Sequence, residues 1–211
     1  MDPRRQAFIE CSEIALALLR SPEIKKRWGE PSALPEFSLR GLAGHLVRGT
    51  GSVKAYLDRG EPEEEPISHA AYYAAAIDVS DIDAPLHVAV RERGEEQAAA
   101  GHAALVELHE AELKHLQRRL AGEPEDRRVK VFKDLVLLLD DYLVTRIVEL
   151  TVHIDDLAVS AGLPTPELPP IAMELAIGNL VEVARLRHGD LAVLRALARR
   201  ERDDVEALRV L

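Results

Sequence analysis

The chain has a single cysteine, Cys11, and this scarcity excludes an intramolecular disulfide. A lone thiol fits a reducing compartment, where structural disulfides are rare. No apolar run is long enough to span a membrane, and Glu10, Ser12 and Glu13 interrupt the N-terminal stretch that a signal peptide would need. We therefore expect a cytoplasmic protein without a membrane partner.

Positive charge and aromatic residues are also scarce. Lysine and arginine total 27 against 37 acidic residues, which gives a formal net charge of −10. This balance disfavours non-specific binding to nucleic acids and to anionic membrane surfaces. Aromatic residues are only 4% of the chain, so leucine, valine, isoleucine and alanine must build the core. Such a composition favours helices over strands.

Apolar periodicity in the 211 residues predicts long helices separated by connections rich in proline and glycine. The predicted helices cover residues 5–19, 39–57, 84–120, 129–158, 171–187 and 191–208. We expect the third helix to break near Gly94 or Gly101, and Ser38 and Asp190 to cap the second and the last.

This order of elements predicts an all-α protein. Residues 1–160 are expected to form an antiparallel four-helix bundle, and the segment AGLPTPELPP makes residues 161–170 a Pro-rich linker. Residues 171–211 then form a C-terminal helical hairpin packed on the bundle.

Two predicted helices carry polar residues on or beside apolar faces. Glu149 and His153 lie four residues apart on a helix that is apolar nearly all round, so both side chains can point at one ion. His45 lies beside Leu46 near the inward edge of the helix 39–57, from which it can face the other two. Two imidazoles and one carboxylate form the ligand set of a catalytic zinc site with an open position.

Each of these signals also has a simpler explanation. A glutamate and a histidine four residues apart occur by chance on many exposed helices, and an inward histidine is more often a hydrogen-bonded core residue than a ligand. Spacing alone therefore leaves a metal site and ordinary packing both open.

Several nearby residues have roles that depend on this site. Arg48 and Arg146 are candidates for binding a substrate carboxylate or for orienting the site, and Arg146 is expected to pair with Glu149 or Asp156. Asp155 and Asp156 are placed to orient an imidazole.

The remaining thiol and histidines are given structural roles. Cys11 is expected to be packed in the first helix, without a catalytic role. Four histidines fall in a loop or on a charged helix face and are expected to be exposed, namely His69, His102, His109 and His115.

Two longer motifs carry a resemblance to a known family. WGEPSALPEFSLRGLAGHLVRG and TRIVELTVHIDDLA resemble the N-terminal motif and the Arg-x-x-Glu-x-x-x-His-x-x-Asp-Leu helix of the mycothiol-dependent maleylpyruvate isomerase family, within the DinB-like superfamily. VRERGEEQAAAG and RHGDLAVLRALARRERDD are similar to further segments of its members. The resemblance implies a DinB-like four-helix bundle in which His45, Glu149 and His153 bind a divalent metal, usually zinc.

The resemblance also implies an activity. The metal would activate a low-molecular-weight thiol, mycothiol, for isomerisation of a small electrophile or for transfer of sulfur onto it. A zinc-dependent hydrolase and a non-catalytic, stress-related metal-binding module are the alternatives. The larger C-terminal domain of the founding isomerase is not evident after Pro170, so the resemblance does not identify the electrophile. We expect a monomer or a homodimer.

Overall fold

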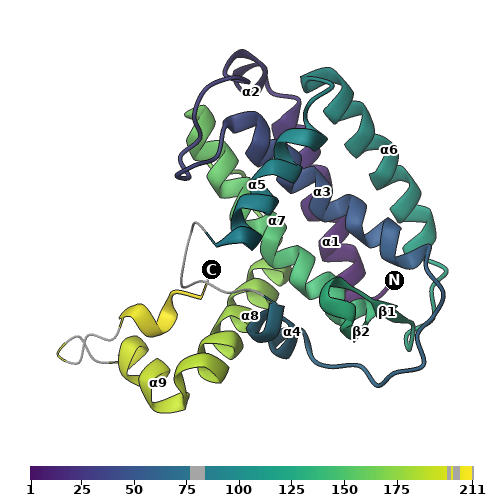
Figure 1. Cartoon of the computed structure of the whole chain (residues 1–211), viewed down its shortest axis with the longest axis vertical. Coiled ribbons are helices and arrows are strands. Elements are labelled where there is room, and N and C mark those ends of the chain that lie inside the picture. Colours follow the sequence, from purple (N-terminus) through teal and green to yellow (C-terminus); the bar gives the residue numbers. More distant parts are fainter. Residues whose placement is uncertain (77–83, 199–200, 202–204, 211) are drawn as a thin grey trace.

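A computed structural model describes residues 1–76, 84–198, 201 and 205–210 of the chain, and its main feature is a four-helix bundle (Figure 1). The bundle helices are α1 (Pro3–Leu19), α3 (Leu39–Leu57), α6 (His102–Leu120) and α7 (Leu139–Ala161). Helices α1 and α3 each pack against both α6 and α7, so the four helices close into a ring around one apolar core. The predicted all-α bundle with a C-terminal helical extension is confirmed.

Shorter elements connect and extend the bundle. The helices are α2 (Pro22–Lys26), α4 (His69–Ala76), α5 (Pro85–Gln97), α8 (Pro170–His188) and α9 (Asp190–Ala198), with 3-10 turns η1 (Phe132–Asp134) and η3 (Val205–Leu208). Strands β1 (Arg128–Lys130) and β2 (Val136–Leu138) pair as a small antiparallel hairpin. Within the described ranges, no helix has both the length and the apolar composition that crossing a membrane requires.

The hairpin corrects the predicted start of the fourth helix. The α-helix begins at Leu139, whereas the apolar pattern placed its start at Val129. Lys133 and Asp134 have φ angles of 57° and 56°, in the left-handed region that an α-helix excludes. Val129 and Leu137 face each other across the hairpin and are both buried, so a strand pair accounts for the apolar run before Leu139.

The long third helix is broken, as predicted, at Gly101, where a φ of 95° separates α5 from α6. Helix α5 packs closely against α3 through glycine. A Cβ atom on Gly44 would lie 2.0 Å from the carbonyl oxygen of Gly94, and one on Gly94 would lie 2.4 Å from that of Gly41. Only glycine permits this approach. The contact holds α3 against α5 at Gly44, the residue that precedes His45.

Gly44→Ala is therefore expected to lower the free energy of unfolding by about 1–3 kcal/mol, because two helix backbones must separate. Gly49→Ala is the matched control on the same helix, since its Cβ atom would meet nothing within 4 Å. The free energy of unfolding of this control should rise by about 0.5–1 kcal/mol, because alanine is more stable than glycine inside a helix. Urea unfolding of both variants checks the pair, and equal effects would contradict the close-contact explanation.

The C-terminal helices differ in part from the prediction. Asp190 is the first residue of α9, and its carboxylate accepts a hydrogen bond from Arg185 Nε at 2.7 Å, so the pair links α8 and α9. Residues 199–200 and 202–204 of the predicted last helix lie outside the described residues, and residues 205–208 form the 3-10 turn η3. The division of the chain at residues 161–170 stays a prediction.

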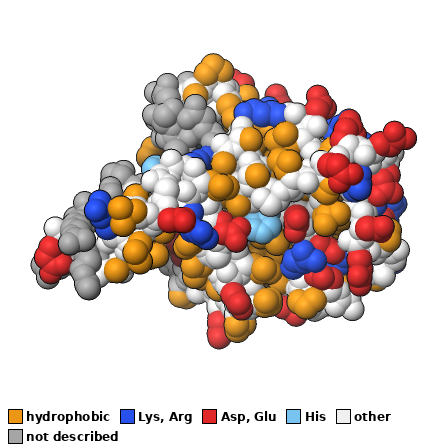
Figure 2. Space-filling view, turned by 90° about the horizontal axis from the view of Figure 1, so that it is seen from below, with side chains coloured by type: hydrophobic (Ala, Val, Ile, Leu, Met, Phe, Trp, Pro, Cys, Tyr) orange, Lys and Arg blue, Asp and Glu red, His pale blue; other side chains and the backbone are white. Residues whose placement is uncertain are grey.

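Helix α8 packs on α7, α4 and α1, whereas α9 packs on α8 and η3. The α8–α9 corner projects from the bundle and carries exposed apolar side chains, visible at the left of Figure 2. They include Leu186, Leu191, Leu194 and Leu197.

The prediction that four histidines are exposed is wrong. His109 is fully buried, and its Nε2 lies 3.1 Å from the carbonyl oxygen of Ser12. His69, His102 and His115 are half-buried. His109 lies four residues from both Leu105 and Leu113, so it belongs to the inner face of α6 rather than to the charged face.

Burial gives His109 a measurable pH signature. It lowers the pKa of this imidazole from 6.5 to about 4. Between these values the unfolded chain binds a proton that the folded protein does not, so stability falls as the pH drops from 6.5 to 4. The loss should reach roughly 3 kcal/mol. The stability of His109→Gln should not fall in this way between pH 6.5 and 4. Urea unfolding at several pH values measures both proteins, and an equal loss of stability in both would contradict the role of His109.

Candidate metal centre

Two neighbouring helices bring His45, Glu149 and His153 together. Helix α7 presents Glu149 and His153 one turn apart, while most of its remaining surface is buried against other helices. Helix α3 packs against α7 and presents His45 to this pair. The predicted ligands thus lie at a contact between two helices whose other side chains are mainly apolar.

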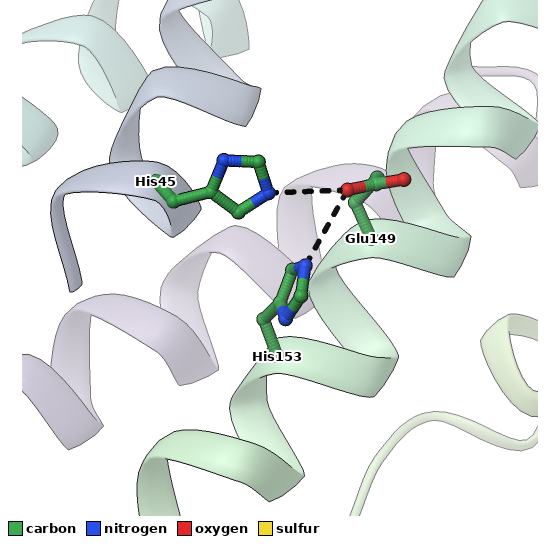
Figure 3. Close-up of side chains that lie close together, drawn as sticks. All are labelled: His45, Glu149 and His153. Atoms are coloured by element: carbon green, nitrogen blue, oxygen red, sulfur yellow. Dashed lines mark ion pairs between the residues drawn. The ribbon is translucent and has the colours of Figure 1, made fainter. Parts of the chain in front are cut away.

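The two imidazoles converge on one oxygen of the Glu149 carboxylate. His45 Nε2 and His153 Nε2 each lie 3.5 Å from Glu149 Oε2 (Figure 3). The two imidazole rings meet edge to face, with centroids 4.8 Å apart. One ligand atom from each residue falls within 4.8 Å of the others. Both imidazole Nε2 atoms therefore face the same small space.

This spacing fits a metal better than a hydrogen-bonded triad. Hydrogen bonds between nitrogen and oxygen usually measure about 2.7–3.2 Å, so separations of 3.5 Å are long. Two ligands about 2.0–2.1 Å from a tetrahedral zinc ion lie roughly 3.3 Å apart. The three side chains keep 17–18% of their surface exposed, so solvent reaches the site. The donor set and these two distances therefore suit a zinc ion that keeps one open position.

Groups outside the triad orient two of its members. Asp156 Oδ2 lies 3.0 Å from His153 Nδ1, an arrangement that directs Nε2 toward Glu149. The Tyr73 hydroxyl lies 2.8 Å from Glu149 Oε1. His45 Nδ1 is buried without a hydrogen-bond partner among the described residues. Of the two aspartates predicted to orient an imidazole, Asp155 instead accepts a hydrogen bond from Thr165.

Two of the three candidate ligands, Glu149 and His45, already have the protonation state that metal binding needs at pH 7. Burial raises the pKa of the Glu149 carboxyl, but His153, His45 and Arg146 outweigh burial and hold this pKa well below its usual range. Burial lowers the pKa of His45, so its imidazole is neutral at pH 7. Burial also lowers the pKa of His153, yet Asp156 and Glu149 raise it to about 9, so metal binding at neutral pH must displace a proton there.

A comparison with protein families identifies the family of the chain. The family model of the mycothiol maleylpyruvate isomerase N-terminal domain matches residues 10–158. The chain belongs to this family. No curated protein and no solved structure matches the chain. The matched range of the mycothiol maleylpyruvate isomerase family contains all three candidate ligands and ends inside α7, before α8 and α9.

The two arginine candidates lie in different surroundings in this family member. Arg48 is exposed and lines a cavity of about 280 Å³ beside α3, with Ser52, Tyr56 and Arg59. Arg146 is half-buried, and its guanidinium lies 5.1 Å from the centre of the Tyr142 ring.

The expected pairing of Arg146 with Glu149 is seen only as an interaction of their charges, because no direct ion pair joins Arg146 to Glu149 or Asp156 among the described residues. Arg146 Nε instead donates to Thr145 Oγ1 at 3.1 Å. Because Tyr142 also contacts Ser52 at 2.8 Å, Arg146 and the cavity are linked through one tyrosine.

Sequence reasoning missed Tyr73. Neither α4 nor a role for its tyrosines was predicted, because HAAYYAAA carries no motif that points to a site. The contact to Glu149 spans 76 residues, so only the tertiary structure reveals it.

Proposed function

We propose that this protein is a zinc-dependent enzyme that uses a low-molecular-weight thiol, mycothiol, to isomerise a small electrophile or to transfer sulfur onto it. His45, Glu149 and His153 would hold the metal. The observation that carries the proposal is the convergence of two imidazole nitrogens on one carboxylate oxygen in a site that solvent reaches. When bound, zinc would keep a coordinated thiol deprotonated at neutral pH.

The chain's own thiol is unsuited to this chemistry. Cys11 lies on α1 and is fully buried, and burial raises the pKa of its thiol to about 12. A thiol with such a pKa is almost entirely protonated at pH 7, whereas the thiolate is the nucleophile. An external thiol therefore fits the site, and the family description names mycothiol.

The proposed reaction needs an electrophilic double bond. The thiolate adds to one carbon of that bond, and the electron pair of the double bond moves toward the activating group. Rotation about the former double bond, now a carbon–carbon single bond, followed by elimination returns the thiolate and the isomer, whereas keeping the carbon–sulfur bond and adding a proton gives transfer.

Arg48, which is exposed beside the cavity, would bind a carboxylate of the electrophile. Arg146, whose guanidinium lies over the Tyr142 ring, would influence the site through its charge rather than bind the substrate. The cytoplasmic location and the monomeric or homodimeric state stay predictions.

Cobalt substitution tests whether a small thiol binds to the metal as a thiolate. Adding a small thiol to the cobalt-loaded protein should produce a thiolate charge-transfer band, and protons should be released near pH 7 because the free thiol is mostly protonated. Cys11→Ala should give the same band, since Cys11 lies outside the site. Absence of the band with every small thiol tried would overturn the transferase and isomerase chemistry and favour a hydrolase with the same ligands. A metal that neither thiol nor water can reach would favour a non-catalytic module.

A further inference from the structure

Tyr73 is a buried tyrosine whose hydroxyl reaches the candidate metal centre. Its side chain is fully buried, and the hydroxyl lies 2.8 Å from Glu149 Oε1 and 3.0 Å from the carbonyl oxygen of Thr145. A phenol has only one proton to donate, so the two acceptors share it. The Thr145 carbonyl alone would satisfy a buried hydroxyl, which makes the second contact informative.

The contact determines which oxygen of Glu149 faces the imidazoles. Oε2 lies 3.5 Å from both Nε2 atoms, while Oε1 lies on the other side of the carboxylate (Figure 3). A carboxylate free to rotate can present either oxygen, or both, to a metal ion. A hydrogen bond to Oε1 removes that freedom and leaves Oε2 as the single ligand atom.

Helix α4, which carries Tyr73, is in turn held by α8. His69 Nδ1 and Asn179 Oδ1 lie 2.5 Å apart, and Asn179 is almost completely buried. Arg187 Nη2 donates to the carbonyl oxygen of Tyr73 at 3.2 Å. Helix α8 therefore contacts α4 at its first residue, His69, and at the backbone of Tyr73 itself, and both contacts support the position of Tyr73.

We propose that Tyr73 is a positioning residue, which donates to Glu149 Oε1 so that Glu149 binds the metal through Oε2 alone. The inference rests on the proposed metal site and adds to it a residue from α4 and a structural role for α8. In this role the tyrosine acts only through the Glu149 carboxylate.

Tyr73→Phe removes the hydroxyl and keeps the ring. Zinc affinity, measured by competition with a chelating dye, should fall about 10–100-fold, the usual cost of losing a group that orients a ligand. The visible spectrum of the cobalt-loaded variant should also change in intensity, because a carboxylate that binds through both oxygens raises the coordination number. A change confined to packing would leave this spectrum unaltered.

Tyr72→Phe is the matched control. Tyr72 is the neighbouring residue on α4 and is also buried, but its hydroxyl makes no hydrogen bond in the described part of the chain. This variant should keep the wild-type zinc affinity and cobalt spectrum. Wild-type affinity and spectrum in Tyr73→Phe would overturn the inference, and so would equal losses in both variants. Failure of the wild-type protein to bind zinc would instead contradict the proposed function itself.

Discussion

Asp140→Ala is expected to lower the free energy of unfolding by about 3–5 kcal/mol, because it leaves a buried guanidinium without its counter-charge. Arg5 Nε lies 2.6 Å from Asp140 Oδ1, and the two side chains are only 6% and 2% exposed. Arg5 also donates to the carbonyl oxygens of Leu120, Glu123 and Pro124. The substitution therefore disturbs the contact of α1 with α7 and with the segment after α6.

The adjacent Asp141→Ala provides the control. Asp141 pairs with Arg4 at 3.2 Å, but the side chains of that pair are 24% and 34% exposed. A partly solvated pair contributes at most about 1 kcal/mol. Urea unfolding of both variants measures the difference. If Asp140→Ala lowers the free energy of unfolding by less than about 1 kcal/mol, the buried Arg5–Asp140 pair does not stabilise the fold, and the prediction is contradicted.

Loss of any one candidate ligand is expected to have the largest effect on metal binding. His45→Ala, Glu149→Ala and His153→Ala should each lower zinc affinity by more than about 100-fold, because removing a ligand must cost more than removing a group that orients one. The three losses should not add, since the ligands act as one unit. Dialysis against a chelator followed by competition titration gives the three affinities.

His188→Ala is the matched control for these substitutions. His188 is the exposed last residue of α8, so the His188→Ala variant should keep the wild-type zinc affinity. Equal affinity in His188→Ala and His153→Ala would place the metal elsewhere.

The site could be predicted from sequence as far as it depends on local spacing. Glu149 and His153 lie one turn apart on any α-helix, and the motif around His45 linked a second helix to them. The structure confirms that the three residues lie together, and metal binding by them stays a prediction. Tyr73 could not be predicted, because its contact depends on how α4 packs against α7 after a long loop.

The fold shows the same division between local and tertiary information. Helix α3 has the predicted limits, Leu39 and Leu57, since Ser38 caps it by accepting from the Gly41 amide. The predicted start of α7 was wrong because an apolar segment directly before a helix looks like a continuation of that helix, and periodicity does not distinguish the two. The predicted exposure of His109 was wrong because the charged residues around it were given more weight than its four-residue spacing from Leu105 and Leu113.

X-ray absorption at the zinc edge of the loaded wild-type protein tests the central claim most directly, because it reports the ligands themselves. The proposed metal centre predicts one zinc ion per chain, with imidazole nitrogen and carboxylate oxygen ligands at about 2.0–2.2 Å and no protein sulfur. These imidazole signals should be absent from a His45→Ala/His153→Ala double variant. A wild-type protein that binds no zinc, or a spectrum without imidazole scattering, would contradict the assignment of His45, Glu149 and His153 as a metal centre.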